Sequence, residues 1–198
     1  NIIKEAIKDK EIVFHLVGIG DVSATSKEDY EKYKRVNVDG TKNILDACVL
    51  NKKIKKIVYF SSTAAMGLLE GVADENSVCK PSTPYQLSKF ESEKLILNYY
   101  KKYKLPIVIL RPSMIYGPGA RNSQIFEIYK FVKIGLIPLI GDGKNNVPLV
   151  YVIDIVDAAI AASKIGKNGE IYIVTNPERN SLKDIINYIK EVSSKRAI

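Results

Sequence analysis

Glu11-Ile-Val-Phe-His-Leu-Val17 is a nearly continuous apolar run, and two similar runs follow at Ile57-Val-Tyr-Phe60 and Ile107-Val-Ile-Leu110. Such runs are typical of strands that are buried on both faces. Helical patterns separate them, over roughly 27–51 and from Tyr85 to about 104. This alternation of strands and helices predicts a parallel sheet with right-handed crossovers. We therefore expect an α/β fold.

Beyond residue 120 the pattern changes and the predicted elements become shorter. We expect, in order, a helix at 122–134, strands at 137–140 and 149–152, a helix from Asp154, a strand at 171–174 and an amphipathic helix from Ser181. Ser181 and Asp184 resemble a capping box at the start of the last helix. We divide the chain into a sheet domain at 1–120 and a lobe at 121–198, part of which returns to the sheet. The lobe is expected to hold the substrate.

The composition narrows the class of protein. The chain has 198 residues, of which 46% are hydrophobic and 26% charged, as in an ordinary globular domain. The net charge is +8, but the lysines are scattered rather than gathered in one stripe, which argues against a nucleic-acid partner. We found no apolar run long enough for a membrane span, no signal-peptide pattern and no metal-ligand spacing. A cytoplasmic protein that binds a small molecule, and no metal, is expected.

The carboxyl ends of the three predicted strands carry the residues of greatest chemical interest. Leu16–Gly18 ends the first strand, Ser61–Thr63 follows the second, and Arg111–Ile115 follows the third. Ligands of open parallel sheets bind beyond these ends. We therefore expect the three groups to converge on one crevice.

Tyr85 and Lys89 stand one helical turn apart and form the most informative pair. Tyr-x-x-x-Lys occurs four times in this chain, so spacing alone proves little. Tyr85 differs because Thr83 can cap its helix and Pro84 suits the first helical position. A nearby ammonium and a helix N-terminus both favour phenolate over phenol. With the hydroxyls of Ser61-Ser62-Thr63, the pair suits proton removal from an alcohol.

Five motifs occur in order, namely Asn37-Val-Asp-Gly-Thr41, Phe60-Ser-Ser-Thr63, Tyr85-x-x-x-Lys89, Arg111-Pro-x-x-x-Tyr-Gly-Pro118 and Tyr151-Val-Ile-Asp154. Together they resemble the extended short-chain dehydrogenase/reductase superfamily, in its NAD-dependent epimerase/dehydratase branch. The resemblance covers nearly all of the chain. It implies a Rossmann-like, doubly wound parallel sheet that binds NAD, with NADP not excluded, and a small C-terminal substrate lobe. It also implies a homodimer formed through the Tyr85 helix and the helix at 27–51.

The resemblance also implies roles for individual positions. Thr63 matches the hydroxyl that bonds the reacting oxygen, Tyr85 the general acid/base, and Lys89 the residue that lowers the phenol pKa and grips the nicotinamide ribose. The remaining positions that match cofactor contacts are Leu16, Val17, Gly18, Phe60, Ser61, Pro112, Met114 and Ile115. Substrate contacts are assigned to Thr63, Ser113 and Arg121. Structural roles are expected for Asn37, which would fasten a helix to the sheet, for His15, and for Asp154 as a helix cap; Ser62 is interpreted as cofactor-lining or structural.

Two departures from the family's pattern matter. The superfamily begins with a strand and a Gly-x-x-Gly-x-x-Gly turn that meets the cofactor pyrophosphate, whereas Gly18-Ile-Gly20 here lacks the third glycine. We therefore expect the chain to be truncated, without about the first three strands and the phosphate loop, which leaves residues 11–17 as an apolar edge. Val147 stands where nucleotide-sugar members often place an arginine that clamps the diphosphate. Arg121 is a candidate to replace it.

The leading functional hypothesis is NAD(P)-dependent chemistry at a secondary alcohol, as part of a nucleotide-sugar epimerisation. Dehydratases of this branch follow the catalytic threonine with an Asp-Glu pair, and Ala64-Ala65 cannot carry protons in that way. A ketone or aldehyde reductase of the hydroxysteroid or dihydroflavonol type is one alternative, since it needs no diphosphate clamp. A non-catalytic member that has lost the phosphate loop is the other.

Overall fold

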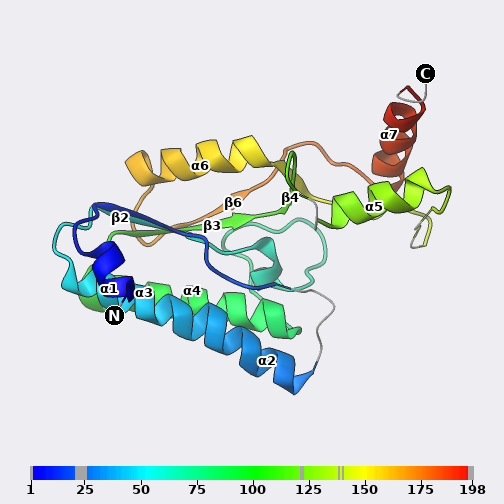
Figure 1. The fold of residues 1–198 in the computed structure, drawn as a ribbon. Coiled ribbons are helices and arrows are strands. Elements are labelled where there is room, and N and C mark those ends of the chain that lie inside the picture. Colours follow the sequence, from blue (N-terminus) through cyan, green and yellow to red (C-terminus); the bar gives the residue numbers. More distant parts are fainter. Residues whose placement is uncertain (1, 21–25, 121–122, 138, 140, 196–198) are drawn as a thin grey trace. The chain divides into compact units, whose positions relative to one another are not determined.

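The computed structural model describes every residue except 1, 21–25, 121–122, 138, 140 and 196–198 (Figure 1). The chain divides into two compact units. The first comprises residues 1–112 and 157–174, and the second comprises residues 113–156 and 175–198.

The first unit contains a four-stranded parallel sheet in the order β1-β2-β3-β6, which confirms the predicted α/β fold. The strands are β1 (Ile12–His15), β2 (Lys56–Phe60), β3 (Ile107–Pro112) and β6 (Ile171–Val174). The register pairs His15 with Tyr59 and Phe60 with Leu110, so the carboxyl ends of β1, β2 and β3 lie side by side.

The two central strands are covered on both faces, as their continuous apolar sequences predict. All six residues of β3 and four of the five in β2 are buried. β1 differs, because Ile12 and Phe14 are 45% and 43% exposed. Within the described part of the chain β1 is an edge strand, which agrees with the expectation of an apolar edge.

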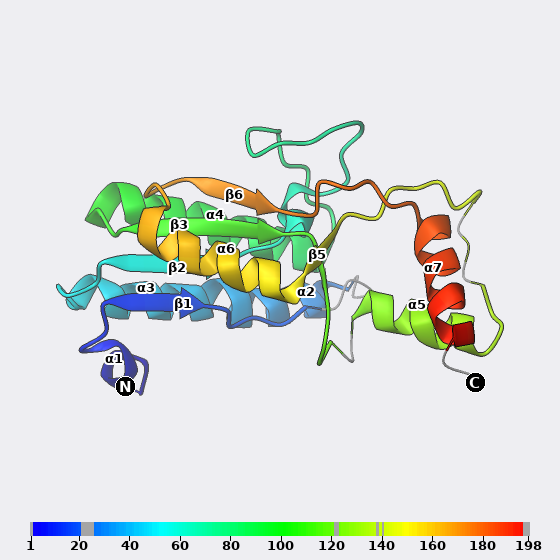
Figure 2. The same ribbon diagram turned by 90° about the horizontal axis from the view of Figure 1, so that it is seen from above.

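Helices cover both faces of this sheet (Figures 1 and 2). One layer holds α2 (Lys27–Tyr33), α3 (Gly40–Leu50) and α4 (Pro84–Tyr103), with α1 (Ile2–Ile7) packed against α3. The other face is covered by α6 (Val152–Ile165), of which residues 157–165 belong to this unit. In the first layer, the core joins Leu45, Ile57, Ile96 and Ile107, each only 1% exposed.

The helix predicted at 27–51 is interrupted by a π-helical stretch, η1 (Lys34–Asp39), between α2 and α3. The cause lies in Asn37, whose side chain is buried and bonds elsewhere in the unit. Its backbone carbonyl accepts a hydrogen bond from the Thr41 hydroxyl at 2.6 Å and another from the Ser92 hydroxyl at 3.2 Å. A wide turn exposes this carbonyl to both partners, and π-bulges are frequent at functional sites.

The second unit contains a two-stranded parallel sheet of β4 (Met114–Tyr116) and β5 (Leu149–Tyr151). Its helices α5 (Gln124–Lys133) and α7 (Leu182–Lys195) pack together. Val147 is 9% exposed and belongs to the core of this unit with Val132, Leu182 and Ile186. The residue at the expected arginine position is therefore a packing residue.

Several boundaries in this unit differ from the predictions. No separate strand was predicted at β4. Of the strand predicted at 137–140, Ile137 and Leu139 lie outside any strand and are joined by a 2.9 Å backbone hydrogen bond, while residues 138 and 140 lie outside the described residues. α6 begins at Val152, so Asp154 lies in its first turn and is not a cap. The capping box of Ser181 and Asp184 is present. Among the described residues, no helix combines the length and apolar character that crossing a bilayer requires.

Candidate active site

Local sequence places Tyr85 in the first turn of α4. The Thr83 hydroxyl accepts from the Gln86 amide at 3.4 Å, and the Gln86 side chain accepts from the Thr83 amide at 3.3 Å. This reciprocal capping box, with Pro84 at the first helical position, fixes where the helix begins. Tyr85 therefore stands at the end of α4 that lies nearest the Ser62-Thr63 segment, in keeping with the contact of α4 with η2 (Thr63–Met66).

The Tyr85 phenol sits in a half-buried position against Ser62. Burial raises the pKa of Tyr85, and a hydrogen bond from the Ser62 hydroxyl opposes this by lowering the pKa. The expectation that Lys89 and the helix N-terminus would favour phenolate is thus not met here, because desolvation dominates. The backbone of Gly20 passes close to the ring, since a Cβ there would be 2.9 Å from Cε2 of Tyr85.

Lys89 is 6% exposed and points to the end of β2. Its ammonium donates to the Phe60 carbonyl at 2.9 Å and lies 5.3 Å from the centre of the Tyr59 ring. Burial lowers the pKa of Lys89 to about 8, while the charge of Glu93 raises it. At neutral pH the side chain is mostly an ammonium, which can donate hydrogen bonds to a ligand.

The three hydroxyls after β2 occupy different surroundings. Ser61 is buried and donates to the carboxylate of Glu93 at 2.5 Å, so its side chain bonds α4. Ser62 caps η2 by accepting from the Ala64 amide at 3.1 Å, and it lowers the pKa of the nearby Tyr85 phenol. Thr63 begins η2 and is half-buried, and its hydroxyl has no hydrogen-bond partner among the described residues. Thr63 is thus the hydroxyl available to a ligand.

The end of β1 lies next to this group. Leu16 and Val17 are 61% and 62% exposed. Asn37 holds the next segment through both backbone groups of Ile19, at 2.8 and 2.9 Å, and its amide also donates to Ser88 on α4 at 2.9 Å. A Cβ on Gly18 would be 3.5 Å from Nζ of Lys89. Asn37 thus fastens this segment to α4, in the structural role expected of it.

His15 also has a structural position. It is 3% exposed, and its Nε2 lies 2.8 Å from the Thr41 hydroxyl, which itself donates to the Asn37 carbonyl. Nε2 is therefore the donor to Thr41. Burial, followed by the charge of Lys89, lowers the pKa of His15 to about 4, so the ring is neutral at physiological pH.

The remaining predicted site residues fall elsewhere. Pro112 ends β3 in the first unit and pairs with Val174 of β6. Met114 and Ile115 form part of β4 in the second unit, where Met114 packs on the core, and Ser113 is buried in that unit. Arg121 lies outside the described residues.

Two contributors to this site were missed by sequence reasoning. Ser62 was not among them, because it was interpreted as a cofactor-lining or structural residue and its cap on η2 agrees with a structural role. The close approach of Gly20 to Tyr85 had no local signal. Glu93 could have been found, because it lies one turn beyond Lys89 on the face of α4 that carries Tyr85, and a charged residue there calls for a partner.

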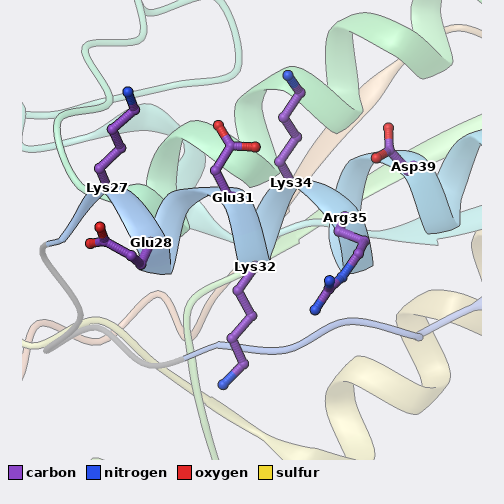
Figure 3. Close-up of a pocket in the computed structure, with 7 residues that line it drawn as sticks. All are labelled: Lys27, Glu28, Glu31, Lys32, Lys34, Arg35 and Asp39. Carbon is purple, nitrogen blue, oxygen red and sulfur yellow. The ribbon is translucent and has the colours of Figure 1, made fainter.

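A surface hollow along α2 and η1 is a different kind of feature (Figure 3). All of its lining residues are charged, namely Lys27, Glu28, Glu31, Lys32, Lys34, Arg35 and Asp39. Four are basic and three acidic, so no single sign of charge accumulates. The site residues Thr63, Tyr85 and Lys89 are not among the residues that line this hollow. We interpret it as a solvated helix surface.

Comparison with known proteins places this geometry in context. The sequence model of the NAD dependent epimerase/dehydratase family matches residues 1–175. The chain belongs to this family. Its similarity to curated relatives includes 28% identity to a Bacillus subtilis protein named as an uncharacterized UDP-glucose epimerase, YtcB, over 94% of this chain and 60% of that protein. It is 33% identical to the dTDP-D-glucose 4,6-dehydratase of Dictyostelium discoideum, over 96% of this chain and 47% of that protein.

A solved structure gives the same assignment of fold. The UDP-glucuronic acid 4-epimerase of Bacillus cereus, crystallised with NAD, superimposes with a TM-score of 0.90 at 26% identity. The match covers 98% of this chain and 62% of that one. The fold is therefore that of the Rossmann-like epimerases, and the chain spans between about half and two thirds of the length of these relatives.

Proposed function

We propose that this chain carries the proton-transfer residues of an NAD-dependent enzyme that acts on a secondary alcohol of a nucleotide sugar, with epimerisation as the reaction. The observation that carries the proposal is the grouping at the start of α4: Tyr85 stands in the first turn, where Ser62 lowers the pKa of its phenol, with Lys89 one turn on and Thr63 next to Ser62 in sequence. The UDP-sugar and dTDP-sugar relatives support a nucleotide sugar as the class of substrate.

Each residue has a distinct part in this mechanism. Thr63 would donate to or accept from the reacting oxygen, for which its hydroxyl is available. Tyr85 would take the alcohol proton as phenolate and return it as phenol, in the manner of a general acid/base. Because burial raises its pKa, the Tyr85 phenol must first lose its proton to solvent; as phenolate it then takes the alcohol proton, and it gives that proton back when the ketone is reduced. Ser62 would stabilise the phenolate through the hydrogen bond that lowers its pKa.

The strand ends fit the nicotinamide half of NAD. Gly18 and Gly20 present backbone without side chains beside Lys89 and Tyr85, as the close approach of their Cβ positions shows. Lys89 would hold the ribose hydroxyls, and the Leu16–Gly18 backbone and Phe60 would line the ring. When bound, NAD would supply the hydride acceptor and donor that a carbinol carbon requires.

Epimerisation is favoured over dehydration by the residues after Thr63. Removal of water needs an acid and a base beside the reacting carbons, and Ala64 and Ala65 can supply neither. Ala65 is also fully buried, in the 3₁₀ turn η2. This difference separates the chain from dehydratase chemistry even though some relatives are dehydratases.

The proposal is tested by turnover of UDP-sugars. The protein is incubated with UDP-glucose or UDP-glucuronic acid and a trace of NAD+, and the product is followed by proton NMR at the inverted carbon. We expect inversion without net NADH, and no inversion with Tyr85→Phe. Calorimetry with NAD+ is the companion measurement: the absence of binding at millimolar cofactor, where the binding free energy is about 4 kcal/mol, would contradict the proposal and favour a non-catalytic member.

One observation favours a second candidate, a ketone or aldehyde reductase. Val147 is buried in the core of the second unit where many nucleotide-sugar members place a diphosphate-binding arginine. A reductase needs no such clamp. The two functions differ in cofactor balance, since a reductase consumes NAD(P)H in proportion to product.

A further inference from the structure

Glu93 extends the Tyr85–Lys89 face of α4 by one more turn. The three residues are spaced four apart, so they share a side of the helix. Lys89 donates to the Phe60 carbonyl at 2.9 Å, and Glu93 accepts from the Ser61 hydroxyl at 2.5 Å. Two consecutive residues at the end of β2 are thus held by two consecutive turns of α4. The next residues in the chain are Ser62 and Thr63.

The Glu93 carboxylate also binds β3. Arg111 donates to it through Nε at 3.0 Å and through Nη2 at 2.7 Å, and the side chains of both residues are 3% exposed. The Ser61 amide in turn donates to the Leu110 carbonyl at 2.8 Å. One buried carboxylate therefore joins α4, β2 and β3 at the strand ends. A two-point guanidinium contact fixes its orientation.

We propose that Glu93 is a positioning residue of this site: by holding Ser61 and Arg111, it fixes the end of β2 and with it the Ser62-Thr63 segment, which leads into η2 against the helix that carries Tyr85. This inference rests on the proposed function for its catalytic consequence. The contacts of Glu93 with Ser61 and Arg111 all lie within the first unit. Because the carboxylate binds the Ser61 hydroxyl as well as Arg111, we infer that it does more than neutralise the arginine.

Glu93 has a second effect, through its charge. The titratable groups around Lys89 are Glu93 and Tyr85 on α4, Tyr59 on β2 and His15 on β1, with Arg111 of β3 beyond Glu93. Burial raises the pKa of both Tyr85 and Tyr59, and His15 has a pKa of about 4, so these three are neutral near pH 7. Glu93 is the group that raises the pKa of Lys89.

Two variants separate the positioning role of Glu93 from the effect of its charge on Lys89. Ser61→Ala removes the hydroxyl and leaves the Glu93–Arg111 pair intact, so the protein should fold. Glu93→Gln keeps the shape and removes the charge. Glu91→Gln is the matched control, because Glu91 lies on the same helix and its carboxylate accepts from the Tyr30 hydroxyl at 2.7 Å instead.

The readouts are NMR signals of the protein without ligand, together with turnover. In Ser61→Ala we expect the Tyr85 13Cζ resonance, assigned with Tyr85→Phe, to shift, and the Lys89 titration to stay unchanged. We also expect kcat to fall about tenfold or more with little change in KM, because small misplacements of reacting groups are costly. In Glu93→Gln we expect Lys89, followed by its side-chain 15N signal and assigned with Lys89→Met, to titrate below its wild-type midpoint. Glu91→Gln should change none of these.

An unshifted Tyr85 resonance in folded Ser61→Ala would overturn the proposal, as would an unshifted Lys89 midpoint in folded Glu93→Gln. Should Glu93→Gln fail to fold, Ser61→Ala alone decides the positioning role. If the wild-type protein turns over no substrate, the proposed function fails, and the two NMR measurements still decide whether Glu93 positions this group.

Discussion

The Lys89 ammonium donates a hydrogen bond to the Phe60 carbonyl while only 6% of the residue is exposed. Desolvating a buried cation whose hydrogen-bond partner is a carbonyl is costly, which is why the pKa of Lys89 falls from its usual 10.5 to about 8. The cation is nonetheless kept at the end of β2, where its partner is the Phe60 carbonyl. The burial of this ammonium should therefore affect the free energy of unfolding in a way that depends on pH.

Lys89→Met should change the pH dependence of stability. With a depressed lysine pKa the unfolded chain binds more protons between about pH 8 and 10.5, so this residue makes wild-type stability rise with pH across that window. Relative to Lys89→Met, the wild type should gain about 2 kcal/mol in unfolding free energy from pH 7.5 to 9.5. Urea unfolding of both proteins at the two pH values measures this. Parallel pH curves would show that Lys89 is not desolvated as described.

Tyr85→Phe should abolish most turnover and leave the fold intact. Loss of the phenolic proton removes general acid/base catalysis, which contributes about 10²–10⁴-fold. Tyr100→Phe is the matched control, since Tyr100 and Lys104 have the same spacing on the same helix but lie at its C-terminal end. Steady-state rates and circular dichroism of both variants give the comparison. A fully active Tyr85→Phe variant would show that Tyr85 is not the general acid/base.

Ser62→Ala and Thr63→Val should have distinguishable effects. Ser62→Ala removes the hydrogen bond that lowers the Tyr85 pKa, so the pKa should rise and the rate profile should move to higher pH. Thr63→Val removes a hydroxyl that has no hydrogen-bond partner in the described part of the chain, so it should reduce kcat while the melting temperature changes little. Rates measured from pH 6 to about 10 distinguish them. An identical profile for Ser62→Ala would show that the Ser62–Tyr85 contact is unimportant.

His15→Gln should make the protein more resistant to acid. The pKa of His15 is lowered from 6.5 to about 4, so the unfolded state binds more protons in between and wild-type stability falls as pH decreases through that window. From pH 7 to 5 the wild type should lose about 2 kcal/mol more than His15→Gln. Glutamine keeps a donor for the Thr41 hydroxyl. Equal losses in urea unfolding would mean that His15 is not buried as a neutral ring.

The order of elements and the start of α4 could be predicted because their signals are local. The apolar runs identify the buried strands, with β6 matched at both ends, and Thr83 with Pro84 identifies the first turn that carries Tyr85. Such signals depend on neighbours a few residues away. They do not depend on which segment packs opposite.

The features that were missed depend on distant partners. The π-helical stretch presents the Asn37 carbonyl to the Ser92 hydroxyl, fifty-five residues on, and the Ser61 hydroxyl bonds Glu93, thirty-two residues on. The ammonium of Lys89 turns to a backbone carbonyl, so its effect on the Tyr85 pKa could not be judged from spacing. β4 is a three-residue strand that exists through its pairing with β5.

The wide turn of η1 depends on the number of residues between Lys34 and Asp39, which the amino-acid composition does not reveal. Deleting one position between Lys34 and Asp39 would let regular α-helical winding run from α2 into α3 with the faces of both helices kept. The loss would be local, because the wide turn that presents the Asn37 carbonyl to the Thr41 and Ser92 hydroxyls would close. Such a deletion would therefore disturb the anchoring of the Ile19 segment by Asn37 more than it would disturb the core.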